Sequence, residues 1–252
     1  MIKLRDILKE IDFGKIPFSD TDAVDDSDAY STYLKKWNYI EEPNTEDEQA
    51  FIEDLQSYIE EPNIHSSQAA HIATVLKHLL PLKSKFPGIL DPSESAKFAY
   101  RGTTIPIKSF INSPSSLQGD DLIFNVKTKL TAKGDRNFLS FSSDQYTAES
   151  FVDMAIDADE EENEMVNSGL IPAIIVLSTS NSNLVFNPDA INFYSATEYT
   201  GGAEENEIFH VGTTLTTDKI IIPSSVARWI RKLDDIPEEH QEAFTKLSSL
   251  YD

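Results

Sequence analysis

The pattern of apolar and polar positions changes after Pro87. Before it, apolar residues recur at helical spacing, which predicts helices at about 2–11, 29–40, 46–60 and 67–81. From about residue 96 onward, short β-rich runs dominate: KFAYRGTTIPI, DLIFNVKTKL, NFLSFSS, PAIIVLSTS, NLVFN, NEIFHVGTTL and DKIIIP. Helices followed by strands with few helices between them predict the α+β class.

This change in pattern also divides the chain. We expect a helical N-terminal region at 1–90, packed on or preceding a β-rich core at 91–252 that ends in helices with a break at Pro237. Within the core, one helix is predicted from Thr147 to about Asp157. The acidic segment that follows it, DADEEENEMVNSG (157–169), is predicted to be a solvated loop.

Composition excludes several classes of protein. The 252 residues are 40% hydrophobic and 25% charged, as in an ordinary folded protein, but the net charge is -22. Such acidity disfavours nucleic acids and anionic membranes as partners. It fits a basic protein target, or it serves solubility alone. The chain has no cysteine, so disulfide and thiolate chemistry are excluded.

The sequence also predicts a cytoplasmic protein. The N-terminal MIKLRDILKEIDFGK lacks the apolar core of a signal peptide. No apolar run approaches the roughly 20 residues that span a bilayer. No zinc signature is formed by the five histidines.

Three short motifs carry candidate chemistry: Tyr100-Arg101-Gly102, Ser140-Phe141-Ser142 and Glu205-Asn206-Glu207. The planar fork of an arginine suits a diphosphate, and a glycine beside it leaves room for close approach. In a strand, residues two apart point the same way, which would pair the two serines and the two glutamates. Each motif alone also fits an ordinary surface. For the glutamates, the run EENE that ends at Glu207 occurs a second time in the acidic segment, at 161–164.

Taken in order, the three motifs resemble the arginine-serine-glutamate class of mono-ADP-ribosyltransferases. The resemblance covers roughly 95–222 and implies an ADP-ribosyltransferase-like fold, with two packed β-sheets flanked by helices and an NAD cleft between the sheets. It implies transfer of ADP-ribose from NAD to arginine side chains of a target protein, with release of nicotinamide. NAD is then a substrate, and no metal is implied.

The resemblance also implies the catalytic residues. Glu207, the second glutamate, stabilises the oxocarbenium-like ribose as the nicotinamide bond breaks. Glu205, the first glutamate, activates the acceptor guanidinium, which is otherwise a poor nucleophile. Ser140 orients Glu207 through its hydroxyl.

For NAD binding the resemblance implies Arg101 at the phosphates, together with Gly102 and Ser142. A loop at 143–147 would cover the nicotinamide, and Tyr146 could stack there. The glycine-rich turn FYSATEYTGGA would recognise the target, with Tyr199 in contact with it.

The sequence Ser178-Thr179-Ser180 follows PAIIVL and is a second candidate for the serine motif. We reject it because no aromatic residue precedes it at the right place. In addition, the family's serine strand leads through a loop into a helix, as SSDQYTAESFVDMA does after Ser142.

The arginine-specific enzymes of large tailed bacteriophages, which modify host transcription and translation proteins, are a similar cytosolic case. Two alternatives stay open. One is an NAD glycohydrolase that uses the same residues with water as acceptor. The other is a non-enzymatic acidic protein, either a binder of basic proteins or a phage structural component.

Overall fold

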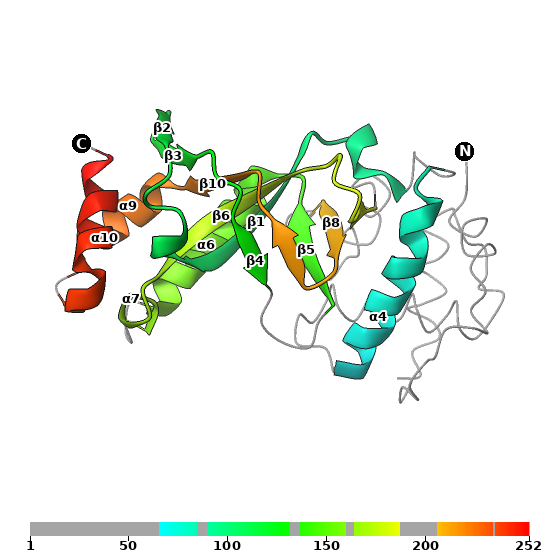
Figure 1. Cartoon of the computed structure of the whole chain (residues 1–252), viewed down its shortest axis with the longest axis horizontal. Helices are drawn as coiled ribbons and strands as arrows, with labels where there is room; N and C mark the ends of the chain where they lie inside the picture. The colour runs from blue at the N-terminus through cyan, green and yellow to red at the C-terminus, as the bar shows by residue number, and fades with distance from the viewer. Residues whose placement is uncertain are drawn as a thin grey trace, which may run out of the picture. The chain divides into compact units, whose positions relative to one another are not determined.

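The computed structural model describes residues 66–84, 90–131, 137–159, 164–186, 206–233 and 235–251 (Figure 1). They form helices and antiparallel strand pairs, so the predicted α+β class is confirmed. The helices predicted at 2–11, 29–40 and 46–60 lie outside the described residues. The chain divides into two compact units, each built from segments that alternate along the sequence.

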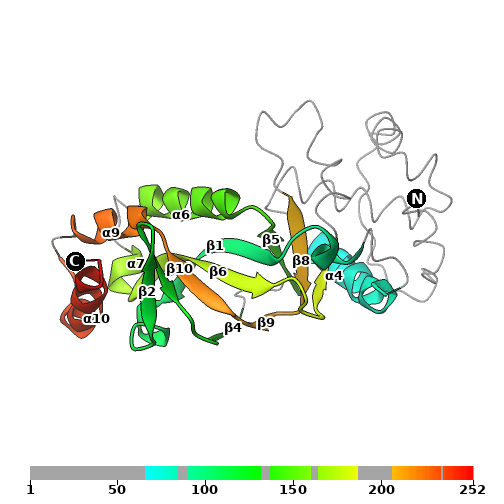
Figure 2. The ribbon, with the colours of Figure 1, turned by 90° about the horizontal axis from the view of Figure 1, so that it is seen from above.

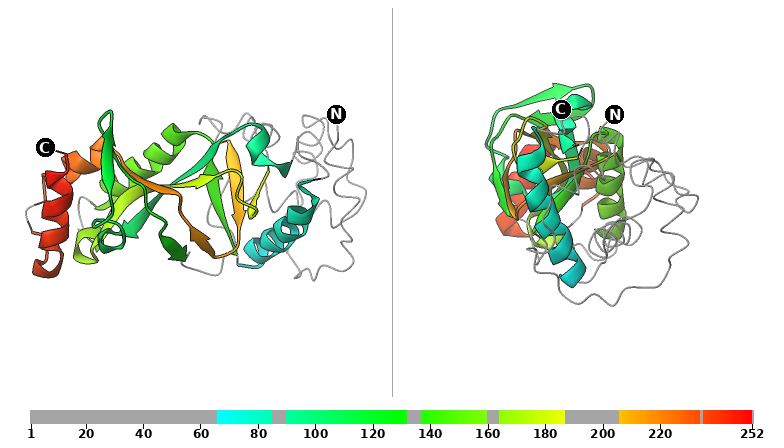
Figure 3. Two further views of the ribbon diagram at one scale, coloured as in Figure 1. Left: turned by 45° about the horizontal axis from the view of Figure 1, so that its top comes forward. Right: turned by 90° about the vertical axis from the view of Figure 1, so that its right-hand side faces the viewer.

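The described part of the first unit comprises 66–84, 90–97, 131, 137–143, 179–186 and 206–213. Its strands follow the order β5 (Phe138–Ser142), β8 (Glu207–Val211) and β7 (Leu184–Val185), with both pairs antiparallel. Helix α4 (Ser66–Leu79) confirms the helix predicted at 67–81, and Figure 3 shows it in cyan beside β8. The 3-10 turns η2 (Leu80–Leu82) and η3 (Pro92–Glu94) follow α4 along the chain.

The core of the first unit explains why α4 forms. Its buried side chains recur at the spacing of one helix face: Ala69, Ile72, Ala73, Leu76 and Leu79. Residues 207–210 of β8 are all buried, so this strand is covered on both faces. A strand covered on both faces favours an apolar run over alternation.

The described part of the second unit comprises 98–130, 144–159, 164–178, 214–233 and 235–251. Its main strands follow the order β2 (Ser115–Gln118), β3 (Asp121–Phe124), β10 (Lys219–Ile222), β6 (Leu170–Ser178) and β1 (Phe98–Pro106). Each neighbouring pair is antiparallel. Strand β6 is buried from Ile171 to Leu177, as its apolar run predicts. Two short strands, β4 (Lys129–Thr131) and β9 (Thr214–Thr216), pair with each other.

Helices cover the strands of the second unit. Helix α6 (Gln145–Asp159) lies over β1 and β6 and buries Ala148, Val152 and Ile156 (Figure 2). The other helical segments are η4 (Ile107–Ser109), α7 (Glu164–Asn167), α9 (Ser224–Ile230) and α10 (Glu238–Ser249). Pro237 precedes α10, so the predicted break in the C-terminal helices is confirmed.

Two predictions around α6 are wrong. The loop expected at 143–147 ends at Asp144, because α6 begins at Gln145. The acidic segment expected to be a solvated loop contributes to two helices: its first residues complete α6, and Glu164–Asn167 form α7. Asp159 explains part of the difference, since its Oδ1 accepts a hydrogen bond from the backbone N–H of Met165 at 2.9 Å. Strand β2, SSLQ, was not predicted because its polar residues give no β pattern.

Candidate functional site

The Ser-x-Ser strand β5 pairs with β8, the strand that begins at Glu207 (Figure 1). Their register places Ser142 opposite Glu207 and Ser140 opposite Phe209. Paired residues share a face of the sheet, and so do residues two apart on one strand. Ser140, Ser142 and Glu207 therefore lie on one face: alternation around Phe141 predicted this for the two serines, and the register adds Glu207.

A hydrogen bond joins two of these residues. The Ser140 hydroxyl donates to Oε1 of Glu207 at 2.5 Å. Glu207 is only 6% exposed, and burying a carboxylate is unfavourable unless hydrogen bonds replace its water. Ser140 thus stabilises the carboxylate and limits its rotation.

The backbone just before Glu207 turns sharply. Asn206 has a φ of 49°, in the left-handed region that asparagine tolerates better than most residues. Its carbonyl accepts a hydrogen bond from the N–H of Ser143 at 3.0 Å, just beyond the end of β5. Strand β8 starts at Glu207, and Glu205 lies outside the described residues, so the expected pairing of Glu205 with Glu207 stays a prediction.

Aromatic rings support this pair of strands. The ring of Phe209 contacts Phe138 and Phe186 edge to face, with centroids 5.8 and 6.0 Å apart. On the opposite face of β8, His210 is 1% exposed and its ring lies 6.4 Å from that of Phe141. Burial lowers the pKa of His210, against backbone hydrogen bonds that favour its charged form. Glu207 is therefore held on a well-packed apolar support.

Arg101 lies in the middle of β1, opposite Ile175 of β6, and its side chain is half-buried. The next residue, Gly102, faces helix α6. A Cβ at Gly102 would lie 2.2 Å from the carbonyl oxygen of Ala148 and 2.7 Å from Cβ of Phe151. On this side of the strand the close approach that Gly102 permits is that of α6, and its role in NAD binding stays a prediction. Strand alternation directs Arg101 to the face away from α6.

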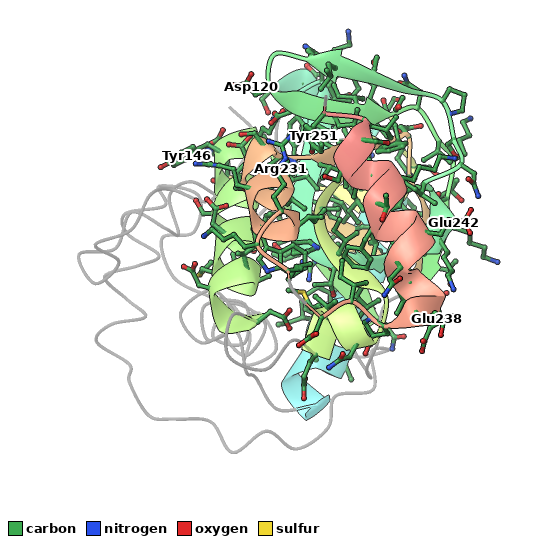
Figure 4. The ribbon with its side chains drawn as sticks, turned by 90° about the vertical axis from the view of Figure 1, so that its left-hand side faces the viewer. Asp120, Tyr146, Arg231, Glu238, Glu242 and Tyr251 are labelled. Carbon is green, nitrogen blue, oxygen red and sulfur yellow. The ribbon has the colours of Figure 1, made fainter. Side chains whose placement is uncertain are left out.

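Tyr146 lies in the first turn of α6 and is 71% exposed (Figure 4). It belongs to a helix and not to the loop that the sequence predicted. Asp144, which the sequence analysis did not single out, caps this helix. Its Oδ1 accepts from the N–H of Tyr146 at 3.1 Å, and its Oδ2 accepts from the hydroxyl of Thr147 at 3.4 Å. An aspartate just before a helical pattern is the signal that could have placed this helix start.

Asp144 also acts on the neighbouring strand β1. The pKa of Tyr100 is raised, first by burial of its hydroxyl and second by the negative charge of Asp144. Both effects disfavour the charged phenolate form of Tyr100.

In the rejected motif Ser178-Thr179-Ser180, the first two residues make structural hydrogen bonds. Thr179 is 2% exposed, and its hydroxyl donates to the carbonyl of Ala96 at 2.5 Å. The N–H of Ser178 donates to Oδ2 of Asp218 at 2.6 Å. These groups hold the end of β6 in place.

The predicted site residues fall into three sets. The first unit brings together Ser140, Ser142 and Glu207. Arg101, Gly102 and Tyr146 belong to the second unit. Glu205 and Tyr199 lie outside the described residues.

Within the described ranges, no group of three His, Cys, Asp or Glu side chains could hold a metal ion. None of the helices that the structure describes is both long and apolar enough to cross a membrane. Comparison of the chain with models of known protein families, with curated proteins and with solved structures found no match. The class of the protein is therefore inferred from its motifs and from the site.

Proposed function

We propose that the protein is an arginine-specific mono-ADP-ribosyltransferase that takes ADP-ribose from NAD. The observation that carries the proposal is the hydrogen bond from Ser140 to Glu207, between adjacent strands and on a buried face. A glutamate oriented by the hydroxyl of the first serine is the pair that the motif resemblance implies. The motif order along the chain supports the same class.

The proposed chemistry follows from the carboxylate. The bond between the ribose C1′ and the nicotinamide nitrogen breaks, nicotinamide leaves with the bonding electrons, and positive charge develops on the ribose. Glu207 stabilises this charge more in the transition state than in the ground state. Because the carboxylate is already desolvated and oriented by Ser140, little reorganisation is needed when the charge appears.

The acceptor step completes the reaction. A guanidinium nitrogen of the target attacks C1′, and its proton passes to the carboxylate of Glu205. Arg101 is assigned to the NAD phosphates, where its planar fork can donate two parallel hydrogen bonds. Tyr199 is assigned to contact with the target protein.

The same proposal extends to the family's fold and to the kind of target protein. The fold would be the family's two packed β-sheets with NAD bound between them. The target would be a basic protein, by analogy with phage enzymes that modify host transcription or translation proteins. The net charge of -22 supports a protein acceptor over a nucleic-acid acceptor.

Labelled NAD tests the proposal, with poly-arginine as acceptor and poly-lysine as its matched control. We expect label on poly-arginine alone and nicotinamide in solution. Glu205→Gln should abolish labelling and retain slow nicotinamide release, since water can replace the guanidinium. Nicotinamide release by the unmodified protein without label on any acceptor would identify an NAD glycohydrolase. The absence of both products would contradict the proposal.

A further inference from the structure

Helix α6 carries an exposed apolar surface. Four large hydrophobic side chains are exposed in the described part of the chain, and three of them lie on α6: Tyr146 at 71%, Phe151 at 45% and Met154 at 54%. Single exposed hydrophobic residues are common on soluble proteins, whereas a cluster marks an interaction site. The concentration on one helix therefore calls for an explanation.

The three side chains follow the geometry of the helix. Tyr146, Ser150 and Met154 are spaced four residues apart, so they form one stripe, and Phe151 lies one turn from Met154. The Cβ of Phe151 borders Gly102, so this residue lies at the edge of the contact between α6 and β1. Figure 4 shows Tyr146 pointing away from the body of the unit.

Charge on this helix has one sign. Residues 144–159 contain five acidic residues and no Lys, Arg or His. Asp144 caps the helix, and Glu149 accepts a hydrogen bond from Gln145 at 2.8 Å. Asp153 and Asp157 are exposed and lie one turn apart, next to the apolar stripe. We call Tyr146, Ser150, Phe151, Asp153, Met154 and Asp157 the α6 surface.

We propose that the α6 surface docks a basic segment of a partner protein. An apolar side chain of the segment would sit on Met154 and Phe151, and its Lys or Arg side chains would lie beside Asp153 and Asp157. Nucleic acids and anionic membranes are repelled by this charge. A second copy of the chain, also at -22, is disfavoured by the same repulsion. The proposal does not depend on the transferase reaction, because docking requires neither NAD nor Glu207.

The probe is a fluorescent amphipathic helical peptide with a leucine stripe flanked by arginines, and its matched form has glutamate in place of arginine. Binding is followed by anisotropy at physiological salt without NAD. We expect the arginine peptide alone to bind. Met154→Asp should weaken binding by about tenfold or more, because it removes an apolar anchor at the centre of the contact. The Asp153→Lys, Asp157→Lys double variant should weaken binding to a similar degree.

A matched double variant on α10 separates docking from general attraction. Glu238→Lys with Glu242→Lys makes the same change in net charge at exposed positions of another helix (Figure 4). Binding within about threefold of the unmodified protein is expected, since charges distant from the contact are screened. Non-specific attraction to the acidic protein would give a different result: the two double variants would weaken binding equally, and Met154→Asp, which adds a negative charge, would tighten it. That result would overturn the proposal. It would also be overturned by no binding of the peptide, or by self-association of the protein that Met154→Asp abolishes.

Discussion

At the scale of single residues, a serine hydroxyl holds Glu207 in one orientation within a buried face. The Ser140 hydroxyl replaces part of the water that an exposed carboxylate would bind. It also restricts the carboxylate to one rotation, so that the charge is in place before the substrate reacts. A serine in this position therefore acts on the reaction through the glutamate and not through contact with substrate.

Ser140→Ala tests this positioning role. We expect kcat for nicotinamide release to fall by about tenfold or more, because the carboxylate loses its oriented donor. KM for NAD should change by less than about threefold, since uniform binding is retained. Ser180→Ala, from the rejected Ser-Thr-Ser, is the control and should leave both constants unchanged. Equal kcat for Ser140→Ala and the unmodified protein would contradict the role.

His210 makes a prediction about pH. Burial holds its folded-state pKa below the ordinary value of 6.5, so the unfolded chain takes up a proton first as the pH falls. The contribution to stability is complete above about pH 6.5 and is lost as the pH falls toward the folded pKa, with a slope of at most about 1.4 kcal/mol per pH unit.

Denaturant unfolding at pH 7.5 and pH 5.5 measures this effect. His210→Phe keeps a ring beside Phe141 and removes the titrating group. The loss of unfolding free energy between the two pH values should be smaller in this variant than in the unmodified protein. Equal losses would show that His210 does not contribute to the acid sensitivity.

At the scale of elements, helix α6 packs closely on strand β1 at the position next to Arg101. The backbone of α6 approaches Gly102 so closely that no side chain fits between them. Asp144 caps the same helix and lies two residues after the end of β5. The start of α6 is thus set by the Asp144 carboxylate, and its contact with β1 by the missing side chain of Gly102.

Gly102→Ala measures the packing of α6 on β1. The added Cβ meets a backbone carbonyl, which can move only with its helix, so the free energy of unfolding should fall by about 1–3 kcal/mol. Thr103→Ala, at the next position of β1, should cost less than about 1 kcal/mol because it adds no atoms. Denaturant midpoints of the two variants give the comparison. An equal, small loss for both would show that the helix does not rest on Gly102.

At the scale of the whole molecule, apolar content decided which elements the sequence could predict. The runs around β1, β6 and β10 have strong β patterns, and the predicted strands are present. Strand β2 is polar and forms only because β3 offers it a partner, which a local pattern cannot indicate. The helical residues of the acidic segment, 157–159 and 164–167, were missed because its charges predict solvent exposure, whereas Asp159 is buried.

The site was predictable to the extent that strand alternation governs it. Alternation placed Ser140 and Ser142 on one face, and register then placed Glu207 beside them. The left-handed backbone of Asn206 is not predicted by strand alternation. The expected pairing of Glu205 with Glu207 stays a prediction, since Glu205 lies outside the described residues. The role of Gly102 depends on α6, a segment more than forty positions away in the chain, and needed the structure.

In the proposed reaction Glu207 is a catalytic carboxylate and not only a buried one. Asp159 provides the control, because it is 5% exposed where Glu207 is 6% exposed, and it accepts a backbone hydrogen bond. The measurement is the rate of nicotinamide release from NAD by the unmodified protein, Glu207→Gln and Asp159→Asn, at equal amounts of folded protein. We expect Glu207→Gln to lower the rate by about 100-fold or more and Asp159→Asn to leave it within about threefold. Equal rates for the two variants, or no nicotinamide release by the unmodified protein, would contradict the claim.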